Sequence, residues 1–113
     1  MESIVAPFPL LLLNSAVLTA YGTFRHRPVS LEEARRLVRA NSWDCAIGHD
    51  ATARIVSMQL GIPCRPARIE MVQQVGQLAL VVRLDSRAPS GRDLDESALE
   101  RIGYHWAVIE RLE

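Results

Sequence analysis

The stretch IGHDATARIVSMQLG, residues 47–61, carries the clearest structural signal in the chain. A glycine and a histidine lead into Asp50, a residue type that favours helix N-termini. An apolar pattern at helical spacing then follows, formed by Ala51, Ile55 and Met58. Gly61 stands where a helix would stop, and a proline lies two residues beyond it. The stretch therefore predicts a connector that opens into a helix from Asp50, its cap, to about Leu60.

The residues before this stretch predict two strands and a helix. Leu10–Leu13 is a continuous apolar run typical of a buried strand, and it ends at the polar residue Asn14. Residues 22–29 are consistent with an extended segment, in which Pro28 favours a sheet edge or a strand end. Residues 30–41 predict a helix that starts with a capping box, Ser30 with Glu33, and closes at Asn41.

The residues after the stretch predict a hairpin, a loop, a third helix and a last strand. Alternation over 68–73 and an apolar run over 78–85 flank Val75-Gly76, which is typical of a hairpin turn. A loop over 86–93, a helix over 95–102 and a strand over 104–110 follow. Together the segments predict a single α+β domain over residues 1–113, with a mixed β-sheet of about five strands flanked by helices and a central hairpin.

Composition narrows the classes of function. The chain has 113 residues, of which 49% are hydrophobic, and its 13 basic and 13 acidic residues cancel. This balance argues against wholesale disorder and against binding of long nucleic acid by bulk charge. The apolar N-terminus is too short and too proline-rich to span a bilayer, so we expect a soluble cytoplasmic protein with no membrane partner.

The arginines and the two cysteines do not by themselves identify a function. All the basic residues are arginine, which a GC-rich genome would produce, and which also suits recognition of phosphate. Cys45 and Cys64 lack the spacing of a zinc site, so we expect two isolated core cysteines, no metal and no disulfide scaffold.

The turn at residues 48–52 has the chemistry of a phosphate site. The first backbone N–H groups of a helix lack intrahelical partners and attract anions, and small residues let an anion approach them. His49 would then lie beside a bound phosphate, where a histidine can protonate a leaving oxygen. The alternative is that Asp50 is an ordinary cap and His49 a loop residue.

The segments AIGHDATARIVSMQLG and CRPARIEM resemble the viral anti-CRISPR ring nucleases of type III immunity and their cellular CRISPR-associated relatives. LLLLN and VVRLDSRAPSGRDLDESAL extend this resemblance to nearly the whole chain. It implies that His49 is the catalytic general acid. It also implies a set of substrate-binding residues: Asn14, Gly48, Asp50, Ala51, Thr52, Arg68 and Arg87.

The resemblance also implies the reaction. The substrate would be cyclic tetra-adenylate, cut without a metal or other cofactor into linear di-adenylates that end in 2′,3′-cyclic phosphates. The enzyme would act as a C2 homodimer, whose symmetry matches that of the ring. It would work in the cytoplasm of a prokaryotic cell, encoded by that cell or by a virus that infects it, and would switch off type III CRISPR signalling.

The sequence departs from the family at three positions. Ala51 stands where relatives commonly have serine, Val17 where a serine follows the first strand, and Ser90 where viral members have a glutamate. These departures keep open an alternative: a non-catalytic module that sequesters or senses a cyclic oligoadenylate. A structural or protein-interaction domain is a third possibility. We assign no chemistry to His26, and expect His105 to be a packed or rim residue of the last strand.

Overall fold

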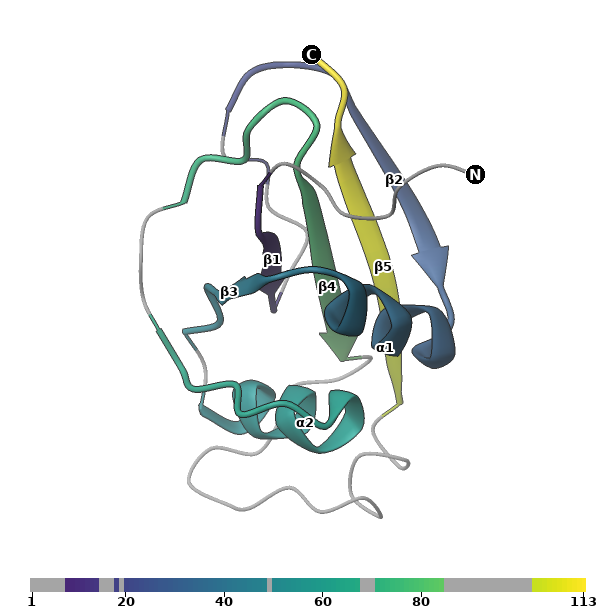
Figure 1. The fold of residues 1–113 in the computed structure, drawn as a ribbon, viewed down its shortest axis with the longest axis vertical. Coiled ribbons are helices and arrows are strands. Elements are labelled where there is room, and N and C mark those ends of the chain that lie inside the picture. The colour runs from purple at the N-terminus through teal and green to yellow at the C-terminus, as the bar shows by residue number, and fades with distance from the viewer. Residues whose placement is uncertain (1–7, 15–17, 19, 49, 68–70, 85–102) are drawn as a thin grey trace.

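The computed structural model describes residues 8–14, 18, 20–48, 50–67, 71–84 and 103–113. Over these residues five strands form one sheet, and two helices lie against it (Figure 1). The strands are β1 Leu10–Leu13, β2 Phe24–Val29, β3 Trp43–Cys45, β4 Leu78–Leu84 and β5 Tyr104–Arg111, and the helices are α1 Leu31–Ala40 and α2 Asp50–Leu60. The predicted α+β fold with a mixed sheet of about five strands is confirmed.

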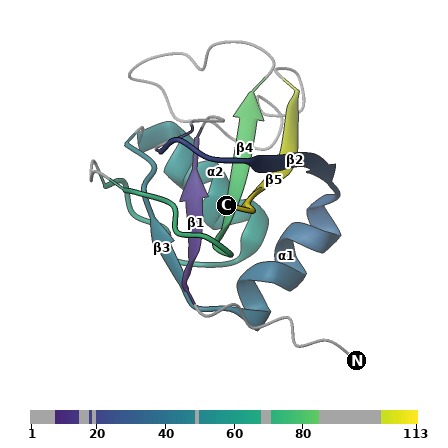
Figure 2. The same cartoon turned by 90° about the horizontal axis from the view of Figure 1, so that it is seen from above.

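Four of the five strands run in the same direction. The sheet order is β2-β5-β4-β1-β3, in which β1 pairs in parallel with both β3 and β4. β5 is antiparallel to its two neighbours, β4 and β2, and its arrow in Figure 1 points opposite to theirs. The sheet twists strongly between β1 and β2 (Figure 2), as expected for strands of L-residues. The carboxyl ends of β1, β2, β3 and β4 therefore meet at one edge of the sheet.

The main core lies between the sheet and the helices. Alternate residues of β1, β4 and β5 pack against the buried faces of α1 and α2, because successive side chains of a strand point to opposite faces of the sheet. This core includes Leu10, Leu12, Ala34, Val38, Ile47, Ala53, Val56, Leu80, Val82, Trp106 and Val108. Burial of this set fixes both helices on the same face.

The helix ends follow the sequence signals. Ser30 caps α1, with its Oγ accepting the N–H of Glu33 at 3.0 Å. Asn41 closes α1 through its backbone and side-chain N–H groups, which both donate to the carbonyl of Leu37. Gly61 ends α2 in the left-handed region, with a φ of 68°, which glycine adopts without strain. Edge strand β2 contains Pro28, as predicted.

The predicted strand over 68–73 is wrong for the part that the structure describes. Residues 71–74 form no strand, although the turn at Val75-Gly76 is present. The central antiparallel pair is instead β4 with β5, because β1 and β5 occupy both hydrogen-bonding edges of β4. Met71 packs on the second face of the sheet, against Leu11, Val81 and Ile109. The apolar side chain of Met71 thus covers part of the sheet face opposite the helices. The predicted loop over 86–93 and helix over 95–102 lie outside the described residues.

Candidate functional site

The start of α2 lies at the edge where the parallel strands end. β3 ends at Cys45, and α2 begins five residues later at Asp50. Asn14 directly follows β1, the parallel neighbour of β3, and its side chain is exposed. In sheets with parallel strands, ligands bind outside the carboxyl ends of the strands, where loops and helix N-termini gather. The described residues therefore bring Asn14 and the start of α2 to the position where such a site is expected.

The connector between β3 and α2 is held on two sides. The N–H of Ala46 donates to the carbonyl of Leu12 at 2.9 Å, which extends the parallel pairing past β3. The N–H of Ala67 donates to the carbonyl of Ile47 at 2.8 Å, and the Ile47 side chain is fully buried. Gly48 follows immediately and is half-buried. These bonds fix the direction in which the chain enters α2.

The structure describes some of the predicted site residues and not others. α2 begins at Asp50 itself, so Asp50 lies in the first turn and not at the cap position predicted for it. An acidic residue there still complements the helix dipole. Thr52 is buried, at 5% exposure, so it presents little of its surface to a ligand. His49, Arg68 and Arg87 lie outside the described residues, as do the side chains of Asp50 and Ala51. Their predicted roles stay predictions.

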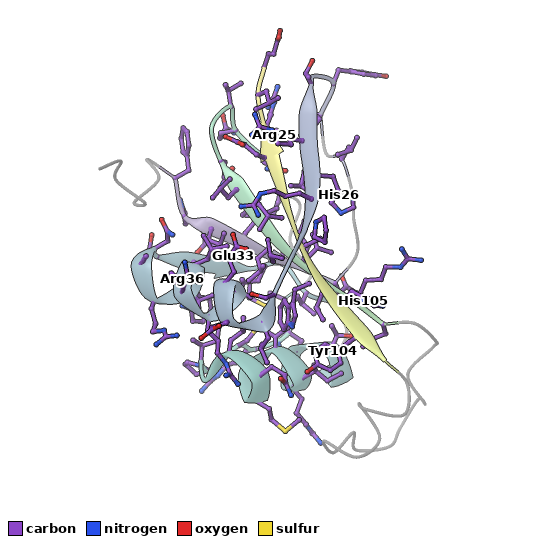
Figure 3. All side chains as sticks on the ribbon, turned by 90° about the vertical axis from the view of Figure 1, so that its right-hand side faces the viewer. Arg25, His26, Glu33, Arg36, Tyr104 and His105 are labelled. Carbon is purple, nitrogen blue, oxygen red and sulfur yellow. The ribbon has the colours of Figure 1, made fainter. Side chains whose placement is uncertain are left out.

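A second cluster of polar side chains lies on the sheet face away from the helices. The register pairs Arg83 with His105, and Pro28 with Ala107, so these side chains share a face with His26 (Figure 3). They line a cavity of about 260 Å³, together with Arg27, Val81 and Trp106. Sequence reasoning treated His26 and His105 separately, because only the pairing of β2 and β4 with β5 brings them together. His105 is exposed, which agrees with a rim position.

The two cysteines are in direct contact, which the sequence did not predict. Cys45 Sγ lies 2.9 Å from Cys64 Sγ, and both thiols are free. Burial raises the pKa of the Cys64 thiol from its ordinary value of 9.0 to about 12, and the neighbouring Cys45 thiol adds to the rise. The expectation of two isolated core cysteines is therefore wrong: Cys64 is a core residue, but the fold brings Cys45 against it.

Among the described residues, no three His, Cys, Asp or Glu side chains cluster closely enough to hold a metal ion. The helices in the same part of the chain are all too short or too polar to cross a membrane.

Comparison with known proteins identifies the family. A family model described as STIV B116-like matches residues 10–106, which is most of the chain. The chain belongs to the STIV B116-like family. This STIV B116-like protein is 30% identical over 110 residues to the uncharacterized protein ORF117 of Acidianus two-tailed virus, covering 92% of the chain and 94% of the relative. It is 27% identical to the uncharacterized protein YddF of Bacillus subtilis, covering 89% and 95%.

Its fold also matches a solved structure. B116 of Sulfolobus turreted icosahedral virus superposes with a TM-score of 0.72, at 19% sequence identity, and the match covers 92% of this chain and all of that one. At this identity the likeness establishes the fold of the STIV B116-like protein. The matches to the viral and bacterial relatives cover about nine tenths of this chain and more than nine tenths of each relative.

Proposed function

We propose that the protein is a metal-independent ring nuclease that cleaves cyclic tetra-adenylate to linear di-adenylates and so ends type III CRISPR signalling. The observation that carries the proposal is that α2 begins at Asp50, two residues after Gly48, at the sheet edge where β1 ends and Asn14 follows. The first backbone N–H groups of a helix have no intrahelical partners and favour a phosphate, and this supports the proposal. The resemblance of the motif to anti-CRISPR ring nucleases supplies the substrate and the reaction.

The proposed chemistry needs one proton donor and one oriented phosphate. The ribose 2′-oxygen attacks phosphorus and releases its proton to solvent, while the bond from phosphorus to the 5′-oxygen breaks. His49 gives a proton to that departing oxygen, so the products are a 2′,3′-cyclic phosphate and a 5′-hydroxyl. Backbone N–H groups at the start of α2 stabilise the charge that gathers on the phosphate oxygens. Two such cuts in a ring of four adenylates give two di-adenylates, and a C2 homodimer would present one site to each of the two cleaved bonds.

The first experiment measures cleavage directly. We would incubate the purified protein with cyclic tetra-adenylate in EDTA and follow the products by chromatography. We expect di-adenylates to form in EDTA at the same rate as in its absence. His49→Ala should lower the rate by at least about 100-fold, which is the lower range for loss of a general acid. His26→Ala is the matched control, because His26 is an exposed histidine on edge strand β2.

The outcomes separate the alternatives. An intact ring after long incubation, or equal cleavage by the His49→Ala protein, would refute the enzyme. Tight binding of one ring per dimer, with no product, would instead favour the sequestering module, which the departures at Val17, Ala51 and Ser90 motivate. If no cyclic oligoadenylate of three, four or six units raises the melting temperature, a structural role is favoured.

A further inference from the structure

The cysteine pair joins two parts of the fold that are otherwise separate in the chain. Cys45 is the last residue of β3, a three-residue strand at the edge of the sheet with one neighbour, β1. Cys64 lies four residues beyond the end of α2 and 19 positions from Cys45. The segment between the two residues contains the whole 48–52 stretch and all of α2. A bond between the sulfurs would therefore close a loop around the candidate site.

Both cysteines are held in place by their surroundings. The N–H of Cys64 donates to Ser57 Oγ at 3.0 Å, and the same Oγ lies 2.9 Å from the carbonyl oxygens of Cys64 and Ala53. Cys64 is thus tied to the middle of α2. Cys45 lies opposite Leu12 in the parallel register of β1 and β3. Because each sulfur is positioned by a different element, their 2.9 Å contact is a property of the fold.

The two thiols differ in access. Cys64 is buried, at 7% exposure, whereas Cys45 is half-buried. A small oxidant in solution would reach Cys45 first. The sulfurs need to approach by only about 0.9 Å to reach bonding distance, a shift within the reach of side-chain rotation.

We propose that Cys45 and Cys64 form a reversible disulfide by exchange with a low-molecular-weight disulfide. The new bond closes the chain segment that contains residues 48–52 and α2. The Cys45 thiol loses its proton and attacks one sulfur of the small disulfide. A mixed disulfide forms, and one small thiolate leaves and takes up a proton. Cys64 then loses its proton and attacks Cys45 Sγ, which releases the second small thiol. Two protein thiols are oxidised, and one small disulfide is reduced to two thiols.

The test counts thiols in the intact native chain. We would equilibrate the purified protein with mixtures of reduced and oxidised glutathione, quench with acid, alkylate, and measure the mass. The expected result is a loss of both alkylation sites and of two hydrogen masses, with monomeric migration on a non-reducing gel. Dithiothreitol should restore both thiols. Two alkylatable thiols that persist in oxidised glutathione, or a mixed disulfide that never closes, would overturn the proposal.

Single variants test the order of the two steps. Cys64→Ser should trap glutathione on Cys45, because the second attack is lost. Cys45→Ser should leave Cys64 without glutathione on the same timescale, because Cys64 is buried. Equal trapping in the two variants would contradict the order. The oxidised wild-type chain should melt about 10 °C above the reduced chain, as expected for a loop of this length in a domain of this size. A rise absent from a fully oxidised sample would show that the bond does not stabilise the loop.

None of these measurements uses a nucleotide, so failure of the disulfide is distinguishable from failure of the ring-nuclease proposal. The effect of oxidation on ring cleavage does rest on the proposed function. Comparing cleavage by the reduced and oxidised proteins would measure it separately.

Discussion

Replacing Gln73 by methionine should destabilise the fold by about 2–4 kcal/mol. Gln73 is buried, at 1% exposure, and its Nε2 donates to the carbonyl oxygens of Gln77 at 2.7 Å and Ile109 at 2.8 Å. Methionine keeps the volume of the side chain but removes both donors. The Gln77 carbonyl still accepts the N–H of Arg111 at 3.3 Å, so losing the hydrogen bond from Gln73 to this carbonyl costs about 1 kcal/mol. The carbonyl of Ile109, on the buried strand β5, loses the hydrogen bond from Gln73, which costs a further amount of about 1–3 kcal/mol.

Urea unfolding followed by tryptophan fluorescence measures this loss. The matched control is Gln74→Met, because Gln74 is exposed and its Nε2 donates to the Val72 carbonyl at 3.2 Å. Its backbone N–H, which donates to Gln77 Oε1, is unaffected. The control should change the free energy of unfolding by less than about 0.5 kcal/mol. If the two variants unfold at the same urea concentration, the Gln73 amide does not anchor this segment to β5 and the reasoning is refuted.

Three further predictions concern the helix cap, the buried thiol and the site arginines. Ser30→Ala should cost about 1 kcal/mol of stability in the same unfolding assay, because the first turn of α1 loses its cap, and an unchanged midpoint would contradict this. The reduced chain should lose stability as pH rises from about 9 towards 12, since the unfolded Cys64 thiol ionises there while the folded one keeps its proton; Cys64→Ala should lack this part of the decline. Arg68→Ala and Arg87→Ala should each lower kcat/KM for cyclic tetra-adenylate at least about tenfold, as expected when a charge-assisted contact is lost, whereas Arg36→Ala, on the exposed face of α1, should match the wild type.

Local patterns were sufficient to predict most of the elements. The apolar run of β1, the cap of α1 and the Gly61 stop of α2 are signals set by neighbouring residues, and each was confirmed. Residues 68–73 show the limit of such patterns. An alternating segment indicates a strand only if an edge of the sheet is free to receive it, and both edges of β4 are occupied.

The candidate site could be predicted only in part, for the same reason. The Gly-His-Asp stretch identified the start of α2 from spacing alone. The shared cavity of His26 and His105 depends on which strands become neighbours, and the contact of Cys45 with Cys64 depends on how the segment after α2 packs against β3. No local signal encodes either arrangement, because both result from long-range contacts.

The sheet order also sets the order in which the chain can fold. β2 is joined to the sheet through β5 alone, and the paired residues Phe24 and Arg111 are far apart in the sequence. A nascent chain therefore exposes both hydrogen-bonding edges of β2 until β5 has been synthesised, and such non-local pairing is slow. The charged residues Arg25 and Arg27, with Pro28, make β2 a poor template for pairing with other chains during this interval. The polar composition of this edge strand thus lowers its tendency to pair with other chains before the protein is folded.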